Sequence, residues 1–349
     1  MRPMGTPRQR TGRTPTAHRS APPEEGEPTV LVLRALGLGD FLTSVPALRA
    51  IDRAHPGYRV HLAAPAGHRD LLRLAGLDWS ITATQGPTAV PWPHTRPPDL
   101  AVNLHGSGPQ SIQALQALRP GLLWTHAHPD TPVASGPHWI SGMHDVDVWC
   151  RLLRHYGVDT GGEDLRLPPP LESSRHPGAA IVHPGAAFPA RRWPELRFAE
   201  ISRNLAARGY RVVITGTETE RPLASRVARV AGLDPRQVLA GRTSVGELAS
   251  LIAEASVVVC GDTGVGHLAT AYSTPSVLLF GPVSPSLWGP RIDPDRHVCL
   301  WKGRFGDPHG EHPDPGLLRI TASEVISALD RVLAVDAPRR HAVAVQRPG

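Results

Sequence analysis

The first residues suited to chemistry follow the first apolar run of the chain. After residues 29–33 the sequence reads Arg34-Ala-Leu-Gly-Leu-Gly-Asp40, and a helical pattern begins directly afterwards. In parallel-sheet proteins the carboxyl end of a strand faces the ligand cleft, so Asp40 is a candidate base for a substrate hydroxyl. Arg34, Gly37 and Gly39 would form the loop around it. The alternative is that Asp40 only caps the helix by accepting backbone N–H bonds.

A second polar loop follows the apolar run 257–260 and reads Gly261-Asp-Thr-Gly-Val-Gly-His267. Glycines let the backbone approach a ligand closely, and the free N–H groups and dipole of a helix start favour an anion. We expect this loop to hold a diphosphate. The residues that would contact it are Asp262, Thr263, Gly264, Val265, Gly266 and His267. The alternative is that Asp262 and Thr263 cap the helix and that His267 is an ordinary helix residue.

Paired arginines precede a helix that starts at a proline, after the apolar run 179–183. Arg191 and Arg192 could clamp phosphate oxygens, and Lys302 is the only lysine among 37 basic residues. The alternative is a solvated arginine pair on a loop anchored by a tryptophan. Glu218 follows the next apolar run, where a carboxylate binds the nucleotide ribose in Rossmann-type folds.

The elements that must position these loops alternate between short apolar runs and helical stretches, which is typical of βαβ units. The predicted strands cover 29–34, 59–64, 99–104, 121–125, 179–183, 211–215, 237–240, 256–260 and 276–280. The predicted helices cover 40–54, 69–75, 110–118, 145–156, 194–207, 219–231, 245–254, 266–272 and 322–333. The fold class is therefore α/β, with two doubly wound parallel sheets.

The composition along the chain predicts two domains joined by one linker. The predicted parts are a disordered arm at 1–28, a first domain at 29–158, a Gly-, Pro- and Ser-rich linker at 159–178, a second domain at 179–336 and a frayed tail at 337–349. Two such domains place a ligand cleft between the carboxyl ends of both sheets.

Several function classes are disfavoured by the same sequence. The position three after Gly39 is Leu42, so the GxGxxG fingerprint of a Rossmann dehydrogenase is absent. The net charge is +6, but the arginines are interleaved with acids and form no basic stripe, which argues against nucleic acid. No metal-ligand set is predicted, and three widely spaced cysteines fit a reduced cytoplasmic monomer.

Taken together, these loops resemble those of glycosyltransferase family 9, the ADP-heptose:lipopolysaccharide heptosyltransferase-like enzymes. The resemblance runs from about Thr29 to about Leu333. Three ordered motifs carry it: 34–40 with Val45-Pro-Ala-Leu-Arg-Ala50, His183-Pro-Gly-Ala with Arg192-Trp-Pro-Glu195, and 262–269 with Phe280-Gly-Pro and Trp288-Gly-Pro. The resemblance implies a GT-B fold, in which two Rossmann-like domains face each other across a cleft.

The resemblance also implies an inverting, metal-independent transferase without a cofactor. The donor would be a nucleotide-diphosphate sugar, ADP-linked, carrying a heptose or a hexose-like sugar on the second domain. The acceptor on the first domain, beside Arg34, Gly37 and Gly39, would be a glycan, a lipid-linked molecule or a metabolite. Asp40 matches the family's base, and Arg191 stands where many members have a lysine. Glu218 matches the ribose site, and Asp262 would orient its loop or bond a ligand hydroxyl.

Two other classes remain open on this architecture. A nucleotide-sugar epimerase or hydrolase would need no acceptor. A non-catalytic nucleotide-sugar-binding protein would use the loop around His267, with Asp40 as a mere helix cap. Candidate site residues in both domains favour the transferase, because a protein that only binds a nucleotide sugar needs no base on the opposite side of the cleft. A lipid-linked acceptor would bring the protein to the inner face of a membrane as a peripheral partner.

Overall fold

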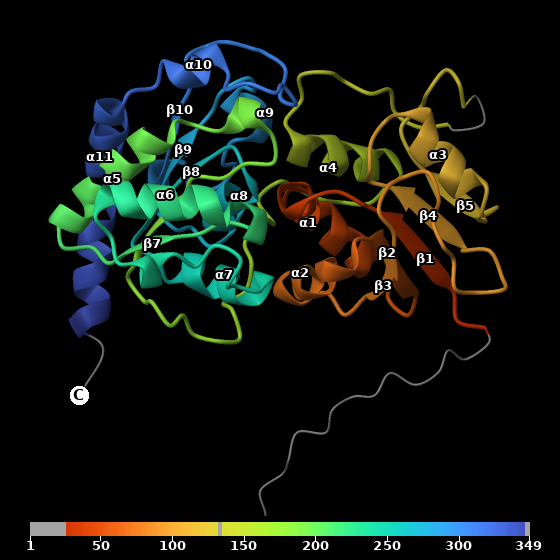
Figure 1. The fold of residues 1–349 in the computed structure, drawn as a ribbon. Helices are drawn as coiled ribbons and strands as arrows, with labels where there is room; N and C mark the ends of the chain where they lie inside the picture. The colour runs from red at the N-terminus through yellow and green to blue at the C-terminus, as the bar shows by residue number, and fades with distance from the viewer. Residues whose placement is uncertain (1–25, 132–134, 346–349) are drawn as a thin grey trace, which may run out of the picture.

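The computed structural model describes residues 26–131 and 135–345. Most of the predicted arm, residues 1–25, and the last four residues of the predicted tail lie outside this part. Within it the chain forms two parallel five-stranded sheets with helices between and around them (Figure 1). None of the helices in these residues is long and apolar enough to cross a membrane.

The first sheet has the strand order β3-β2-β1-β4-β5. Its central strands are short apolar runs that are almost wholly buried, as expected when helices cover both faces, whereas the edge strands β3 and β5 are partly exposed. The elements of this half are β1 Thr29–Leu33, α1 Leu38–Ala54, β2 Arg59–Ala64, η1 Ala66–His68, α2 Arg69–Leu74, β3 Ser80–Ala83, β4 Leu100–Asn103, α3 Pro109–Gln116, β5 Leu122–Trp124 and α4 Asp145–His155. The chain moves from β1 toward one edge of the sheet through β2 and β3, and toward the other edge through β4 and β5. The topological switch point therefore lies between β1 and β4, at the loops that follow these two strands.

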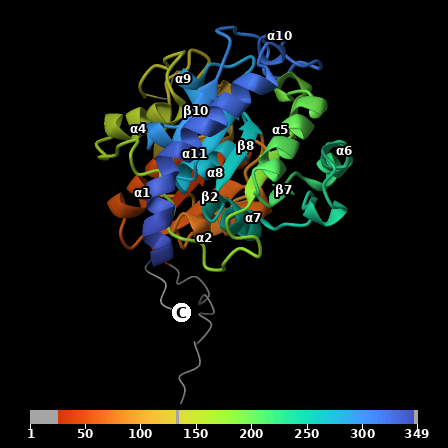
Figure 2. The ribbon, with the colours of Figure 1, turned by 90° about the vertical axis from the view of Figure 1, so that its left-hand side faces the viewer.

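The second sheet has the order β10-β9-β8-β6-β7. Its elements are β6 Ala180–His183, η2 Pro189–Arg191, α5 Glu195–Ala207, β7 Val212–Ile214, η3 Glu218–Glu220, α6 Arg221–Ala231, η4 Pro235–Gln237, α7 Val245–Ala253, β8 Val257–Gly261, α8 Gly264–Ala271, β9 Ser276–Leu279, α9 Pro285–Trp288, η5 Pro294–Arg296, β10 His297–Leu300, α10 Pro315–Leu318 and α11 Ala322–Val345. The switch point lies between β6 and β8, so the loops that follow these two strands face the first half. Figure 2 shows α11 crossing this half beside α5.

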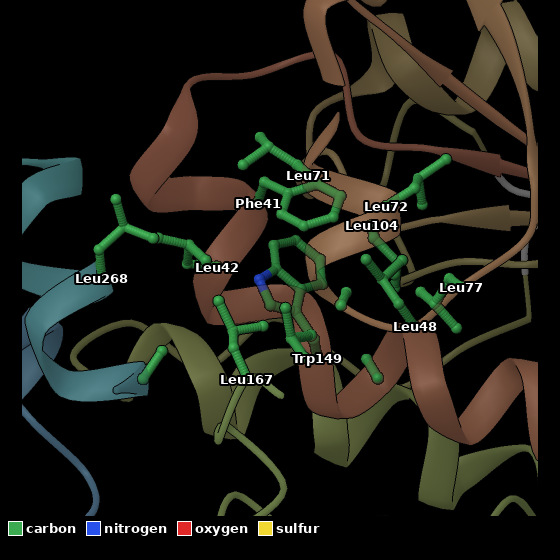
Figure 3. Close-up of a cluster of buried hydrophobic side chains, with 14 of the residues drawn as sticks. Phe41, Leu42, Leu48, Leu71, Leu72, Leu77, Leu104, Trp149, Leu167 and Leu268 are labelled. Carbon is green, nitrogen blue, oxygen red and sulfur yellow. The ribbon is translucent and has the colours of Figure 1, made fainter. Parts of the chain in front are cut away.

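One hydrophobic core runs from the first sheet through α1 and α8 into the second half. Leu42 of α1 lies beside Leu268 of α8, and Trp149 of α4 lies beneath Phe41 (Figure 3). A Cβ atom built on Gly264 would lie 2.7 Å from Cγ of Leu38, so the first turns of these two helices touch. The two halves are therefore closely packed along the α1–α8 contact.

Several predicted elements differ from the structure. The strand predicted at 237–240 is wrong: Val238 forms only an isolated bridge to Ile214, because η4 turns the chain just before it. The edge strands β3 and β10 were not predicted, since each has only four residues and neither is fully buried. The helix predicted at 322–333 continues to Val345, well into the predicted tail.

The tight contact between α1 and α8 predicts the effect of one methyl group. We expect Gly264→Ala to lower the free energy of unfolding by about 1 to 3 kcal/mol, because the added Cβ must displace Leu38. Chemical denaturation measures this. The control is Gly246→Ala in the first turn of α7, where an added Cβ would lie 4.0 Å from Oγ of Ser244 and stability should hold or rise. Equal stability of both variants would contradict the tight contact.

Candidate functional site

Asp40 lies in the first turn of α1, at the carboxyl end of β1. The helix begins at Leu38, and Gly37 is its N-cap, so Asp40 is the third helical residue. Its carboxylate still interacts with the backbone N–H groups of Gly37 and Asp40, as the capping alternative expects. Its side chain is about one third exposed, at 32%. A carboxylate in this position is stabilised by the helix dipole yet reaches solvent.

The pKa of Asp40 is raised above its ordinary value. Burial raises it most, the Arg34 guanidinium lowers it and the Asp145 carboxylate raises it, while backbone N–H groups of Gly37 and Asp40 lower it. A raised pKa makes the ionised carboxylate a stronger base at neutral pH. The environment therefore suits proton abstraction better than that of an ordinary surface aspartate.

Arg34 is buried beneath the Asp40 loop. Its Nε and Nη2 donate to the Asp40 carbonyl oxygen at 2.9 and 2.7 Å, and its Nη1 donates to the Leu104 carbonyl oxygen at 2.6 Å. Its side chain is 1% exposed. The residue predicted to line the acceptor loop thus supports the first turn of α1 from below.

Asp145, the first residue of α4, was not singled out in the sequence. Its Oδ2 accepts hydrogen bonds from Arg34 Nη2 at 2.9 Å, Thr43 Oγ1 at 2.6 Å and Trp149 Nε1 at 3.0 Å. The guanidinium of Arg34 also stacks over the Trp149 ring, 4.6 Å from its centroid. Asp145 and Arg34 are 111 positions apart, so no local pattern connects them.

The loop 261–267 forms the uncapped start of α8. The helix begins at Gly264, two residues before the predicted start, and the side chain of its N-cap Thr263 makes no capping hydrogen bond. Helix starts of this kind leave backbone N–H groups available to an anion. The glycines serve packing as well: a Cβ on Gly266 would lie 3.1 Å from Leu278, and one on Gly261 would lie 3.0 Å from the carbonyl oxygen of Arg191.

The side chains of Arg191 and Arg192 point toward different neighbours. Arg191, the last residue of η2, directs Nη1 toward the loop after β8, 4.0 Å from Asp262 Oδ2. Its Nε is buried and has no hydrogen-bond partner among the described residues. Arg192 turns back and donates from Nε to the Ala186 carbonyl oxygen at 2.9 Å. Arg191 alone of the two is therefore placed to meet an anion at α8.

Burial perturbs both titratable side chains of the α8 loop. It raises the pKa of Asp262 to about 6, against the lowering effect of Arg191, and Asp40 raises it further. Burial also lowers the pKa of His267 to about 4, so the imidazole is neutral at pH 7. His267 can therefore donate or accept a hydrogen bond in the free protein, but it carries no positive charge there.

The carboxylates after β7 lie on η3. Glu218 is exposed and forms an ion pair with Arg221 at 2.5 Å. Glu220 accepts the backbone N–H bond of Thr217 at 2.8 Å, and its carboxylate covers Gly185 in the loop after β6. Glu218 is thus the freer of the two for a ligand hydroxyl.

The two polar loops meet across the seam between the halves. A Cβ built on Gly39 would lie 3.0 Å from Cδ2 of His267 and 3.5 Å from Cα of Gly264. The base candidate and the anion site therefore face each other. Among the described residues no three His, Cys, Asp or Glu side chains come together as metal ligands.

Known proteins resemble this chain in sequence and in fold. Residues 150–306 match the model of glycosyltransferase family 9 (heptosyltransferase). Lipopolysaccharide heptosyltransferase 2 of Salmonella typhimurium is 34% identical over 226 residues, which is 54% of this chain and 64% of that protein. Lipooligosaccharide heptosyltransferase 2 of Haemophilus influenzae is 32% identical over 160 residues, 43% of this chain and 46% of that protein.

The chain is thus similar to glycosyltransferases of family 9 over part of its length. It spans between about half and two thirds of the length of these two curated relatives. The solved ADP-heptose lipopolysaccharide heptosyltransferase II of Escherichia coli superimposes with a TM-score of 0.68 and 21% identity, covering 88% of this chain and 99% of that one. The predicted GT-B fold is confirmed. The family match includes Arg191 and the α8 loop, whereas Arg34 and Asp40 lie outside it.

The raised pKa of Asp262 predicts a pH-dependent effect on stability. The folded chain holds this proton more tightly than the unfolded chain, so the ionised carboxylate destabilises the fold above about pH 6 and has little effect near pH 4. We expect Asp262→Asn to raise the free energy of unfolding by about 2 to 3 kcal/mol at pH 7.5 and by much less at pH 4. Urea unfolding at both pH values checks this. A difference that does not change with pH would contradict it.

Proposed function

We propose that this chain is an inverting glycosyltransferase that moves a heptose, or a hexose-like sugar, from an ADP-linked donor to an acceptor hydroxyl. The observation that carries the proposal is the contact between the first turn of α1, which contains Asp40, and the uncapped start of α8, together with the effect of Asp40 on the pKa of Asp262. The relatives named as heptosyltransferases support the donor class. The acceptor, held by the first half, would be a glycan, a lipid-linked glycan or a metabolite.

In the proposed reaction the Asp40 carboxylate takes the proton of the acceptor hydroxyl. The freed oxygen attacks the anomeric carbon from the side opposite the diphosphate. The bond between that carbon and the diphosphate oxygen breaks, and its electron pair stays on the diphosphate. Attack from the opposite face inverts the configuration of the sugar, and one base is enough for such a single displacement.

The leaving diphosphate gains negative charge as that bond breaks, and the α8 side of the seam is suited to bind it. Arg191 supplies a fixed positive charge, and its unpartnered Nε is a hydrogen-bond donor that a phosphate oxygen would satisfy. The N–H groups at the start of α8 and the neutral His267 supply further donors. These groups neutralise the charge from within the chain, so we propose that the reaction needs no metal ion.

Asp262 and Glu218 complete the proposed donor site. With its pKa at about 6, Asp262 can hold a proton when the anion arrives, which limits its repulsion of the phosphates. The exposed Glu218 would accept a hydrogen bond from the nucleotide ribose. An epimerase or hydrolase on the same fold would release ADP without any acceptor, so a requirement for an acceptor separates the classes.

The role of Asp40 is tested by Asp40→Asn. We expect turnover to fall about 100-fold or more while ADP-sugar affinity changes little, because a lost base affects the transition state and not donor binding. ADP release from ADP-heptose is followed with a panel of acceptors that begins with heptose-free lipopolysaccharide core. Wild-type turnover in the variant would remove Asp40 from this role.

The donor site is tested by ADP binding in the presence of a chelator. Arg191→Ala should weaken binding by about 1 to 3 kcal/mol in calorimetry, the size of a lost charge-assisted hydrogen bond. The matched comparison is Arg192→Ala, which removes an equal charge from a side chain bonded to its own loop and should have a smaller effect. Unchanged affinity in Arg191→Ala would place the diphosphate elsewhere, and binding abolished by the chelator would contradict the metal-free site.

A further inference from the structure

Arg34 lies between two carboxylates, and its distances to them differ. Its Nη2 is 2.9 Å from Oδ2 of Asp145 but 3.8 Å from Oδ1 of Asp40. The first distance is that of a charge-assisted hydrogen bond, whereas the second is too long for one. The guanidinium is therefore bonded to the Asp145 carboxylate and to the Asp40 carbonyl oxygen, but it is only near the Asp40 carboxylate.

Asp145 is well suited to hold this cation. Its Oδ2 also accepts from Thr43 and Trp149, so its position is fixed from α1 and from its own helix. Both partners of the Arg34–Asp145 pair are buried, and a buried guanidinium without a carboxylate partner is strongly unfavourable. If Asp145 lost its charge, the next carboxylate within reach of Arg34 would be that of Asp40.

We propose that Asp145 is a positioning residue for the base: it binds the Arg34 guanidinium and so keeps the Asp40 carboxylate out of a tight ion pair. A carboxylate paired closely with arginine loses proton affinity, by one to three pKa units in typical cases, and would be a poor base. Arg34 already lowers the pKa of Asp40 at its present distance, and Asp145 also raises that pKa by direct repulsion, so the test must separate the two effects. The proposal rests on the proposed function only in taking Asp40 as the base.

Other charged or titratable groups also face Asp40 from the surrounding elements. They are His68 at the end of η1, His267 on α8, and Asp262 after β8, which is itself paired with Arg191. Replacing Asp145 by asparagine removes none of them. A change in the titration of Asp40 in that variant therefore reports on Arg34 and Asp145.

The test is Asp145→Asn, which keeps the size and shape of the side chain but removes the charge that binds Arg34. In the full chain labelled with ¹³C-aspartate, the Asp40 carboxyl resonance is assigned by its loss in Asp40→Asn and titrated. We expect its pKa to fall by about one unit or more. In a crystal structure of the variant, Arg34 Nη2 should approach Asp40 to about 3 Å. The matched control is Asp147→Asn, which removes a carboxylate of the same helix that pairs with Arg291 and should leave Asp40 unchanged.

An unchanged pKa of Asp40 in Asp145→Asn would overturn the proposal. A lower pKa with Arg34 still 3.8 Å from Asp40 would overturn it too, because Asp145 would then act only by direct repulsion. Where turnover is measurable, the acid limb of its pH profile should move to lower pH and the maximum should fall, since the base is weaker. The titration needs no substrate, so it decides the role of Asp145 even if heptose transfer fails.

Discussion

The site depends on one close contact, that between the first turns of α1 and α8. Leu38 and Gly39 on one side and Gly264 and His267 on the other leave no room for added side-chain atoms. Each helix follows a strand at the switch point of its own sheet, so the contact brings the two switch points together. A carboxylate and an uncapped helix start then face each other, although 222 positions separate Asp40 from Asp262.

Each half has an arginine and a carboxylate at this contact, but the more buried of the two is the arginine in the first half and the carboxylate in the second. In the first half the Arg34 side chain is buried and hydrogen-bonded, and the nearby Asp40 carboxylate is partly exposed. In the second half Asp262 is buried, and Arg191 carries the unpartnered Nε. Under the proposed function, the first arrangement would provide a base and the second would provide a cation for a phosphate. Both pKa values of the carboxylates are raised, mainly because burial disfavours their charged forms.

The sequence predicted the two sheets well because their central strands are apolar runs bounded by polar loops. It was weakest where pairing at a sheet edge decides the outcome. Val238 looked like part of a strand but forms a single bridge, and the short β3 and β10 gave little apolar signal. Helices α1 and α8 also begin before their predicted starts, at Leu38 and Gly264, and these two residues pack against each other.

The residue types in the loops were enough to name candidate site residues. They did not show which contacts each of these residues makes. Arg191 and Arg192 are adjacent and identical, and only the fold shows that one bonds its own loop. The same holds for Arg34 and Asp145, whose pairing depends on α4 packing against α1. Long-range partners of this kind leave no spacing in the sequence, so burial and hydrogen bonding must assign them.

The division of the family match between the halves has a physical meaning. The matched residues 150–306 contain η2, Arg191 and the α8 loop, which are the groups suited to a diphosphate. Most of the first half lies outside the match, including the loop after β1 and the Arg34 network. A diphosphate presents the same charge and oxygen geometry whatever the acceptor, so the side that holds it is constrained. The proposed base needs only a carboxylate of raised pKa at the seam; burial raises the pKa of Asp40 most, Arg34 lowers it, and Asp145 raises it. In the proposed reaction the residues around this base would fit the acceptor, and they lie outside the family match.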